Sequence, residues 1–361
     1  MKRILLLALI IATSQLFAQE NYNYNKFKQL KEELATPTVY RTASGAPGHE
    51  YYQQKASYNI DVTIDDEKQS ISGKETITYK NNSPDKLEYL WIQLDQNVRA
   101  KDSDTKLIKT SRGSSSSFGE NVNFKDLANL HNDFDGGFKL EYVKDGKGKD
   151  LKYTINKTMM RVDLPTALLP GATYSLKIGY WYNVNDRMKG GGRSGYEYFP
   201  KDDNYLYTIA QFFPRMAVYN ETEGWQNKQF LGNGEFTLPF GDYKVNITVP
   251  SDHIVGATGV LTNASSVLTS EERARFKKAQ TEYQTPVIIV TQAEAEEKEK
   301  TKVKTTRTWS FSATNVRDFA FASSRKFIWD AMTVKYNGKS TLAMSFYPKE
   351  GNPLWERYST R

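Results

Sequence analysis

Residues 205–250 read YLYTIAQFFPRMAVYNETEGWQNKQFLGNGEFTLPFGDYKVNITVP, and this stretch decides the fold. It opens with a strand-like run at 205–210 and closes with residues 242–249, where Val and Ile alternate with Lys, Asn and Thr. Alternation with a period of two predicts a half-buried strand. We therefore expect two strands joined by a long, Pro-broken loop.

The loop between these two expected strands is rich in polar and aromatic side chains. They are Gln211, Arg215, Tyr219, Glu221, Glu223 and Trp225. Loops that rigid strands hold in place often carry binding residues. Residue types alone leave two interpretations open: a β-sandwich loop whose polar groups satisfy one another, and a site that faces a ligand.

The stretch resembles a known family of zinc metallopeptidases. The run YTIAQ at 207–211, Arg215 four residues further on, and a strand ending in Val249-Pro250 are similar to the N-terminal domain of the aminopeptidase N and leukotriene hydrolase family, which belongs to the gluzincins. In that family a Tyr-Thr-x-x-Gln run leads into a loop carrying an Arg. The resemblance implies that Gln211 binds the free amino end of a peptide substrate.

The loop also departs from the family pattern. The family usually has Pro-Cys and Asp-x-Pro after the Arg, whereas this chain has AVYN at 217–220 and GW at 224–225. The departure indicates a divergent branch whose substrate contacts differ more than its fold. We expect Arg215 and Trp225 to fix the loop.

Other segments extend the resemblance over nearly all of the chain after its first residues. They are LWIQL at 90–94, LPG at 169–171 and NVRDFAFA at 315–322. The resemblance covers only the non-catalytic half of the family, so the catalytic domain would begin at about Asn352 and its zinc motif would lie beyond Arg361. Zinc is thus expected as the cofactor of the full-length enzyme, with no catalytic residue and no metal ligand in this chain. The expected partners are a peptide or protein substrate and the missing catalytic domain.

The N-terminus has the pattern of a secretory signal peptide. Lys2 and Arg3 precede an apolar core at 4–12, and a cut after Ala18 is expected. The apolar run is too short for a bilayer span, which needs about 20 residues. These features predict an exported protein, periplasmic or extracellular, with no membrane span after signal removal.

Composition excludes several kinds of site. The chain has no Cys, which excludes disulfides, cysteine-ligated zinc and a thiol nucleophile. Its 49 Lys and Arg are interleaved with 42 Asp and Glu, and no basic block of the nucleic-acid-binding type occurs. The three His are scattered: His49 precedes Glu50 but lacks a second His one helical turn on, and His131 and His253 stand apart. The sequence predicts no zinc site within these residues.

The remaining pattern predicts a mainly β fold: a large antiparallel β-sandwich or saddle with long loops and a few short helices, plus the start of a helical catalytic domain. Further strands are expected at 58–64, 71–79, 87–94, 138–143, 151–155, 159–164, 174–182, 253–261, 286–291, 305–313, 316–322, 328–336 and 340–347. The predicted domains are a signal peptide at 1–18, an N-terminal extension at 19–55, the β-domain at 56–348 and the start of a truncated catalytic domain at 349–361.

Local signals predict the helices and turns. A helix pattern occupies 25–34, a long loop with one short helix near 124–130 occupies 101–137, and the Gly run at 190–195 is typical of a hairpin tip rather than a phosphate loop. Thr269 and Glu272 form a capping box that opens a helix running to about 280. Residues 293–304 are expected to be a solvated loop, and Asn352-Pro353 to begin a last helix.

Two functions follow. The first is the substrate-anchoring part of an exported zinc aminopeptidase, inactive as the given chain. The alternative is a stand-alone exported β-sandwich that binds a glycan or a protein partner through aromatic loop residues.

Overall fold

A computed structural model describes residues 37–104, 134–190, 192, 194–232, 237–358 and 360. The expected signal peptide, the helix pattern at 25–34, the helix near 124–130 and His131 lie outside these residues. The chain divides into two compact units, Met1–Tyr51 and Tyr52–Arg361.

The described residues of the first unit form turns. Arg41 and Pro47 make an isolated antiparallel bridge. The Gly48 N–H donates to the Tyr40 carbonyl at 2.7 Å. His49 lies in a turn and is exposed, so it is not on the helix that a zinc motif would need.

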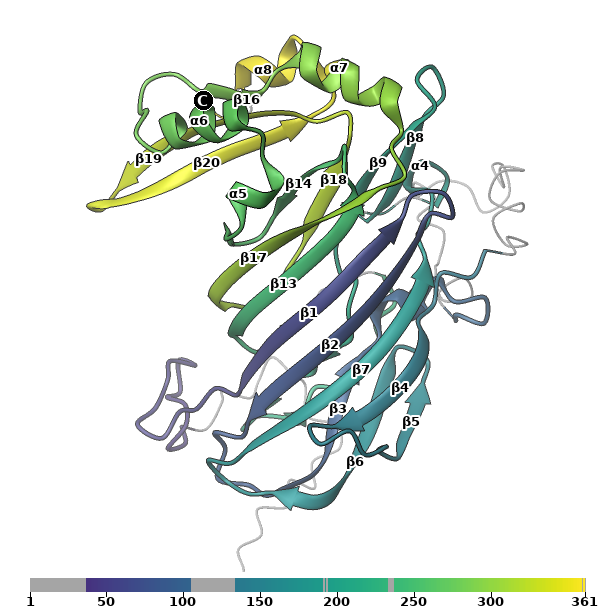
Figure 1. Cartoon of the computed structure of the whole chain (residues 1–361). Coiled ribbons are helices and arrows are strands. Elements are labelled where there is room, and N and C mark those ends of the chain that lie inside the picture. Colours follow the sequence, from purple (N-terminus) through teal and green to yellow (C-terminus); the bar gives the residue numbers. More distant parts are fainter. Residues whose placement is uncertain are drawn as a thin grey trace, which may run out of the picture. The chain divides into compact units, whose positions relative to one another are not determined.

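The second unit is mainly β, as the sequence predicts (Figure 1). Its strands are β1 Lys55–Asp65, β2 Ser70–Lys80, β3 Leu87–Gln93, β4 Lys139–Asp145, β5 Tyr153–Asn156, β6 Met159–Leu168, β7 Thr173–Asn183, β8 Gly195–Phe199, β9 Asn204–Ile209, β10 Arg215–Met216, β11 Tyr219–Asn220, β12 Gly224–Trp225, β13 Gly241–Pro250, β14 Ile254–Ala257, β15 Val260–Leu261, β16 Val287–Val290, β17 Thr306–Val316, β18 Phe321–Ser324, β19 Ile328–Tyr336 and β20 Lys339–Tyr347. Its helices are the 3-10 turns η1 Asp95–Arg99 and η2 Lys349–Gly351, and α4 Arg187–Gly190, α5 Ala264–Val267, α6 Ser270–Ala279, α7 Gln292–Thr301 and α8 Leu354–Tyr358.

A seven-stranded sheet forms one layer, in the order β15-β17-β13-β1-β2-β7-β4. The β1–β2 hairpin turns at Asp65, whose Oδ1 accepts from the N–H of Glu67 and of Lys68, both at 3.0 Å. β13 runs parallel to β1, with Tyr58 opposite Tyr243, whereas the other named strand pairs of this sheet are antiparallel. The antiparallel prediction is therefore confirmed except at this pair, which joins strands far apart in the sequence.

Three smaller sheets and a two-stranded ribbon complete the described fold. Their orders are β10-β3-β6-β5, β14-β18-β9-β8, β16-β19-β20 and β11-β12. Inward-facing residues of the seven-stranded sheet and of the β3 and β9 sheets share one apolar core. The rings of Tyr58 and Tyr243 stack there with centroids 4.7 Å apart. Each large apolar side chain buried in this core contributes about 1.5–3 kcal/mol to folding.

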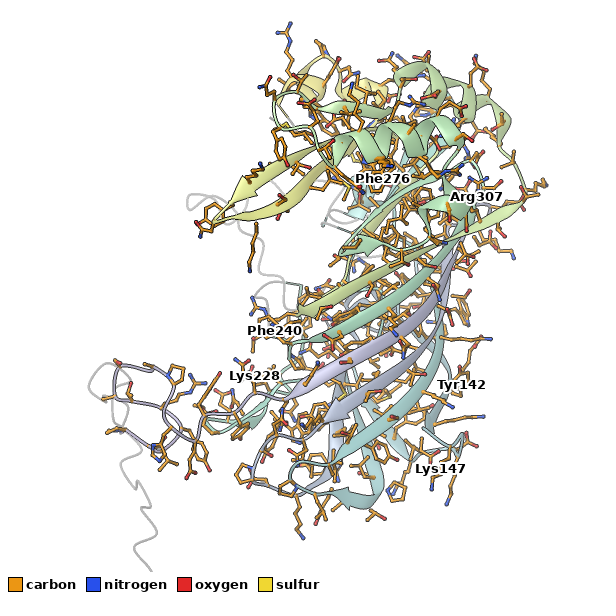
Figure 2. All side chains as sticks on the ribbon, turned by 60° about the vertical axis from the view of Figure 1, so that its left-hand side comes forward. Tyr142, Lys147, Lys228, Phe240, Phe276 and Arg307 are labelled. Atoms are coloured by element: carbon orange, nitrogen blue, oxygen red, sulfur yellow. The ribbon has the colours of Figure 1, made fainter. Side chains whose placement is uncertain are left out.

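The outer face of the seven-stranded sheet is polar. Tyr142 on β4 stands over Gly179 of β7, where an added Cβ would lie 2.4 Å from the ring (Figure 2). A side chain at position 179 would therefore displace the Tyr142 ring, and glycine allows the ring to lie directly on the backbone of β7. Lys144 lies over the same ring, 5.4 Å from its centroid.

Helices α6 and α7 accompany the β16-β19-β20 sheet. Phe276 of α6 packs on Trp329 of β19, with ring centroids 5.2 Å apart (Figure 2). The capping box predicted at Thr269 is confirmed, since its hydroxyl accepts from the Glu272 N–H at 3.1 Å and the Glu272 carboxylate accepts from the Thr269 N–H at 2.9 Å.

The expectation of a solvated loop at 293–304 is wrong, because most of this segment is helix α7. Thr291 and Glu294 form a second capping box. The Glu294 carboxylate also pairs with both terminal nitrogens of Arg275, at 2.6 and 2.9 Å. Ala295 and Glu299 are buried on the inner side of the helix. Tertiary contacts thus order a segment whose Glu- and Lys-rich composition indicated solvent.

Two further expectations are wrong in detail. The strand expected at 316–322 is interrupted, since β17 ends at Val316 and β18 begins at Phe321. Asn315, one residue before the end of β17, has a positive φ of 55°, which departs from extended backbone. The Gly run, as far as its residues are described, joins α4 to β8 and is not a hairpin tip. The last helix is confirmed as α8.

Candidate functional site

The two strands predicted at the two ends of the stretch 205–250 are confirmed as β9 and β13. The loop between them crosses to another sheet, because β10 pairs with β3 and places Arg215 opposite Gln93. The loop then forms the β11–β12 ribbon, in which Tyr219 lies opposite Trp225. Residues 233–236 of the loop are outside the described part of the chain.

Gln211, the predicted substrate-binding residue, lies two residues after the end of β9. Its backbone is left-handed, with a φ of +56°, which costs a residue with a Cβ about 1–2 kcal/mol. The Gln96 side-chain amide donates to the carbonyls of Ala210 and Gln211, at 3.3 and 2.9 Å. The Ser194 hydroxyl donates to the Ala210 carbonyl at 3.2 Å and accepts from the Ala210 N–H at 3.1 Å.

Two buried rings hold the chain on the other side of Gln211. Phe212 and Phe213 are both fully buried. Phe212 packs edge-on to Phe321, and Phe213 packs edge-on to Tyr58, with centroids 5.1 and 5.2 Å apart. The backbone of Gln211 is therefore fixed from both directions. Its side chain is half-buried and has no hydrogen-bond partner among the described residues.

Arg215 is buried between two carboxylates. Its Nε and Nη2 donate to Asp95 Oδ2 at 3.0 and 2.9 Å, and its Nη1 donates to Asp318 Oδ2 at 2.7 Å. Burial raises the pKa of Asp95 and of Asp318, and the guanidinium opposes both rises. Burial lowers the pKa of Arg215, but the carboxylates outweigh it and hold that pKa above its ordinary value. These contacts agree with the interpretation of Arg215 as the residue that fixes the loop.

Trp225 also fixes the loop. Its ring packs edge-on to Tyr219 at 5.2 Å and lies 6.1 Å from the ring of Tyr79, which is fully buried. The Tyr219 hydroxyl donates to Asp85 Oδ2 at 2.8 Å. The ribbon is thereby attached to the core and to the turn before β3.

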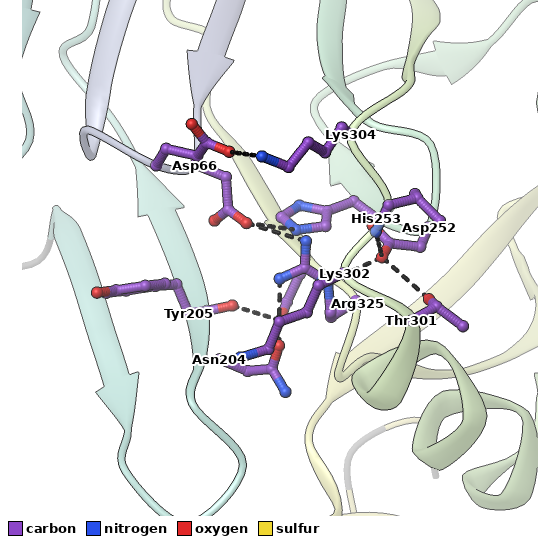
Figure 3. A network of polar contacts seen from close by, with 12 residues as sticks. Asp66, Asn204, Tyr205, Asp252, His253, Thr301, Lys302, Lys304 and Arg325 are labelled. Carbon is purple, nitrogen blue, oxygen red and sulfur yellow. Dashed lines mark hydrogen bonds and ion pairs between the residues drawn. The ribbon is translucent and has the colours of Figure 1, made fainter.

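A second polar network lies where β14, β18 and β9 meet the β1–β2 turn (Figure 3). The buried guanidinium of Arg325 donates to Asp252, Asn204 and Asp66 at 3.0, 3.1 and 2.9 Å. His253 is fully buried, with Nδ1 2.9 Å from Ser323 Oγ. Burial and the nearby Arg325 lower the pKa of His253 to about 3, so its ring is neutral. His253 is thus a structural residue.

Lys326 anchors a third network. It has no exposed surface, and its Nζ lies 2.6 Å from Asp202, 3.1 Å from Glu299 and 3.0 Å from Glu350. Burial lowers the pKa of Lys326, but these carboxylates outweigh it and the net shift is upward. The network ties α7 and η2 to the β8–β9 turn.

A pocket of about 330 Å³ opens beside this network, away from Gln211. Its lining residues are Asp202, Glu296, Glu299, Lys300, Lys302 and Lys349. Three carboxylates and three ammonium groups balance in charge, so the lining selects neither an anion nor a cation. We place the candidate site at Gln211 on its geometry.

Sequence reasoning missed the side chains that surround Gln211. Gln96 and Asp95 come from the LDQN run after β3, and Ser194 comes from the residue before β8. The available signal was a cluster of polar residues directly after an apolar strand. Nothing in the sequence paired that cluster with residues more than one hundred positions away.

The described residues contain no group of three or more His, Asp or Glu that could hold a metal ion. Within the same residues, no helix is long and apolar enough to cross a membrane.

Comparison with known proteins finds no matching family model and no matching curated protein. Among solved structures, an M1 zinc metallopeptidase from Deinococcus radiodurans is similar at a TM-score of 0.43 and 12% identity, over 84% of this chain and 49% of that chain. A mutant form bound to a Tyr-Ser-Ala substrate gives the same TM-score and identity over 82% and 48%. A two-domain M1 zinc metallopeptidase mutant bound to L-arginine is similar at a TM-score of 0.41 and 13% identity, over 82% of this chain and 48% of that chain. The chain spans about half the length of these structures.

Proposed function

We propose that this chain is the substrate-anchoring N-terminal part of an exported zinc metallopeptidase that removes residues from the amino end of peptides. The sequence resemblance at 207–211, Arg215 and Val249-Pro250 supports this proposal. The mainly β fold supports it too, because the resembling residues lie on two strands and the loop between them.

The geometry of Gln211 is the observation that carries the proposal. Its backbone is held in a left-handed conformation by neighbouring hydrogen bonds and buried rings, whereas its side-chain amide has no partner in the described part of the chain. Backbone strain that surrounding structure maintains is concentrated at functional sites. The Gln211 amide oxygen can accept a hydrogen bond from the α-ammonium of a peptide.

Zinc in such an enzyme supplies a polarised carbonyl and a water of lowered pKa. The described residues do not fit that group, since no ligand set occurs among them. In the proposal the metal is held by a separate catalytic domain, and the residues described here orient the substrate's amino end. Export follows from the signal-like residues 1–18 and belongs to the same proposal.

Substitution of Gln211 in the complete enzyme tests the role. We expect Gln211→Ala to raise KM for aminoacyl amides and to lower kcat/KM about 10- to 100-fold, because a hydrogen bond to a charged group is lost. Gln211→Glu should retain or increase activity, since a carboxylate pairs more strongly with an ammonium. Gln280→Ala, at an exposed glutamine at the end of α6, is the matched control.

Unchanged kinetics in Gln211→Ala would place the substrate's amino end elsewhere. The alternative function, a glycan- or protein-binding module, stays a prediction. It would gain support if the complete gene product showed no peptidase activity and bound a glycan or protein through this domain.

A further inference from the structure

The feature that carries a further inference is the set of side chains behind Gln211. Gln96 is buried and lies in η1, directly after β3. Its side-chain nitrogen donates to two successive carbonyls, those of Ala210 and Gln211. Its side-chain oxygen accepts from Arg99 Nη1 at 3.1 Å. All three bonds use one amide group.

The orientation of the Gln96 amide determines which contacts are possible. A glutamine amide has a donor end and an acceptor end of nearly the same shape. Reversing it would place the side-chain oxygen against two carbonyl oxygens, which repel it. Arg99 is only a donor, so it requires the oxygen end. The guanidinium and the two carbonyls therefore select one orientation together.

Arg99, which is half-buried, differs from the two buried arginines. Arg215 and Arg325 each bind two carboxylates, and their pKa values are raised despite burial. The only hydrogen bond of the Arg99 guanidinium within the described residues goes to Gln96. Burial lowers the pKa of Arg99, with Tyr182 and Asp95 opposing that shift. Arg99 is thus held beside a neutral amide rather than a counter-ion.

The charges nearby account for this placement. Arg215, Asp95 and Asp318 together carry one net negative charge when ionised. Arg99 interacts electrostatically with Asp95, and its guanidinium donates a hydrogen bond to Gln96. Arg99 thus contacts Gln96 directly and is coupled to the ion cluster of Arg215 through the electrostatic interaction alone.

We propose that Gln96, oriented by Arg99, is a positioning residue that holds Gln211 in its left-handed conformation and so aims the Gln211 side chain at the substrate's amino end. The aiming part rests on the proposed function, whereas the conformational part does not. Without the two Gln96 bonds, the strain of the left-handed backbone is opposed only by Ser194 on one side and by the buried rings on the other. Gln211 would then relax toward ordinary backbone angles.

Gln96→Glu tests the conformational part on the chain itself. The change preserves the shape of the side chain but replaces the donor with a carboxylate oxygen that faces two carbonyls. We expect backbone chemical shifts and the HN–Hα coupling of Gln211 to leave the left-handed range in NMR spectra. Gln229→Glu is the matched control, because it adds the same charge at another hydrogen-bonded glutamine, whose side chain contacts Thr158 and Asn156 and not Gln211.

Arg99 is tested by two variants of a half-exposed residue. Arg99→Met removes the donor that orients the amide, and we expect a partial shift of the Gln211 signals. Arg99→Lys keeps a donor and should restore most of the original spectrum. If Gln211 keeps its left-handed signals in both Gln96→Glu and Arg99→Met, the positioning role is wrong.

The complete enzyme tests the aiming part. Displacing Gln211 removes its hydrogen bond to the substrate's ammonium group, so we expect Gln96→Glu to lower kcat/KM for free-amine substrates about 10- to 100-fold. The effect should fall mainly on KM at temperatures where the variant stays folded. A structural role alone would lower stability and leave KM unchanged. A complete enzyme with no activity on aminoacyl substrates would refute the proposed function, while the NMR result would still decide the conformational part.

Discussion

Buried polar groups have different partners in the region around Gln211 and in the region around Lys326. Around Lys326 and Arg325, every buried cation lies within 3.1 Å of carboxylate oxygens. Around Gln211, a strained backbone is held by a neutral amide, and Asp95 Oδ1 has no hydrogen-bond partner. Backbone strain and unpaired atoms occur in both regions, since Asp203 and Lys302 also have positive φ and Asp252 Oδ1 also lacks a hydrogen-bond partner. The two regions therefore differ in what holds them: ion pairs around Lys326, and a neutral amide behind Gln211.

Glu75 is another buried polar residue without a hydrogen-bond partner. It lies on the inward face of β2 between Ile60 of β1 and Ile178 of β7. Both carboxylate oxygens are buried without a hydrogen-bond partner, and burial raises its pKa well above the ordinary value. Glu75 interacts electrostatically with Tyr58, whose hydroxyl accepts from the Met216 N–H. The core next to the loop between β9 and β13 thus contains a carboxylic acid that is packed among other side chains without a hydrogen-bond partner.

The largest expected effect is at the anchoring region. Lys326→Met should destabilise the protein by about 3–5 kcal/mol, because it leaves the half-buried Asp202 and the buried Glu299 with Lys349 as their remaining cation. Urea unfolding measures the change. Lys300→Met, at an exposed lysine paired with Glu297, is the control and should change stability little. Equal effects in the two variants would show that the buried ion pairs of Lys326 stabilise the protein no more than an exposed pair does.

His253 gives the anchoring region a pH dependence. Its folded pKa of about 3 is below its ordinary value of 6.5, so its contribution to stability is present above pH 6.5 and is lost as the pH falls toward 3. Between pH 7 and pH 4 we expect this residue to account for a loss of about 3 kcal/mol. His253→Gln should therefore lose less stability than the parent over this range, measured by urea unfolding at each pH. Parallel curves for the two proteins would contradict a neutral buried ring.

Glu75→Met should change stability in the opposite direction. A carboxyl whose folded pKa is raised contributes stability below its ordinary pKa of 4.5 and loses it as the pH rises. Replacement with an apolar side chain should stabilise the protein by about 2 kcal/mol at pH 8 and by less at pH 4. Glu88→Met, at an exposed carboxylate on β3, is the control. A loss of stability at pH 8 would show that Glu75 has a favourable partner.

Several elements could be predicted because their signals are local. The alternation of residues 58–64 and 71–79 gave β1 and β2, and Thr269 with Glu272 gave the start of α6. The same Thr-x-x-Glu pattern occurs at Thr291 and opens helix α7, although the Glu- and Lys-rich composition of the segment favours a loop. The local signal is therefore present there, and the bidentate Arg275–Glu294 pair is a further contact that the sequence does not reveal.

The sequence by itself determined most of the long strands and which of their residues face inward, because side-chain direction alternates within each strand. It did not predict the short strands β10, β11 and β12. It also determined the position of Gln211 between two strands. Only the tertiary structure decided that β13 lies parallel to β1, that Lys326 meets three carboxylates, and that Gln96 holds a residue 115 positions away. These contacts depend on which strands become neighbours. That choice is made by packing of the whole core rather than by any short segment.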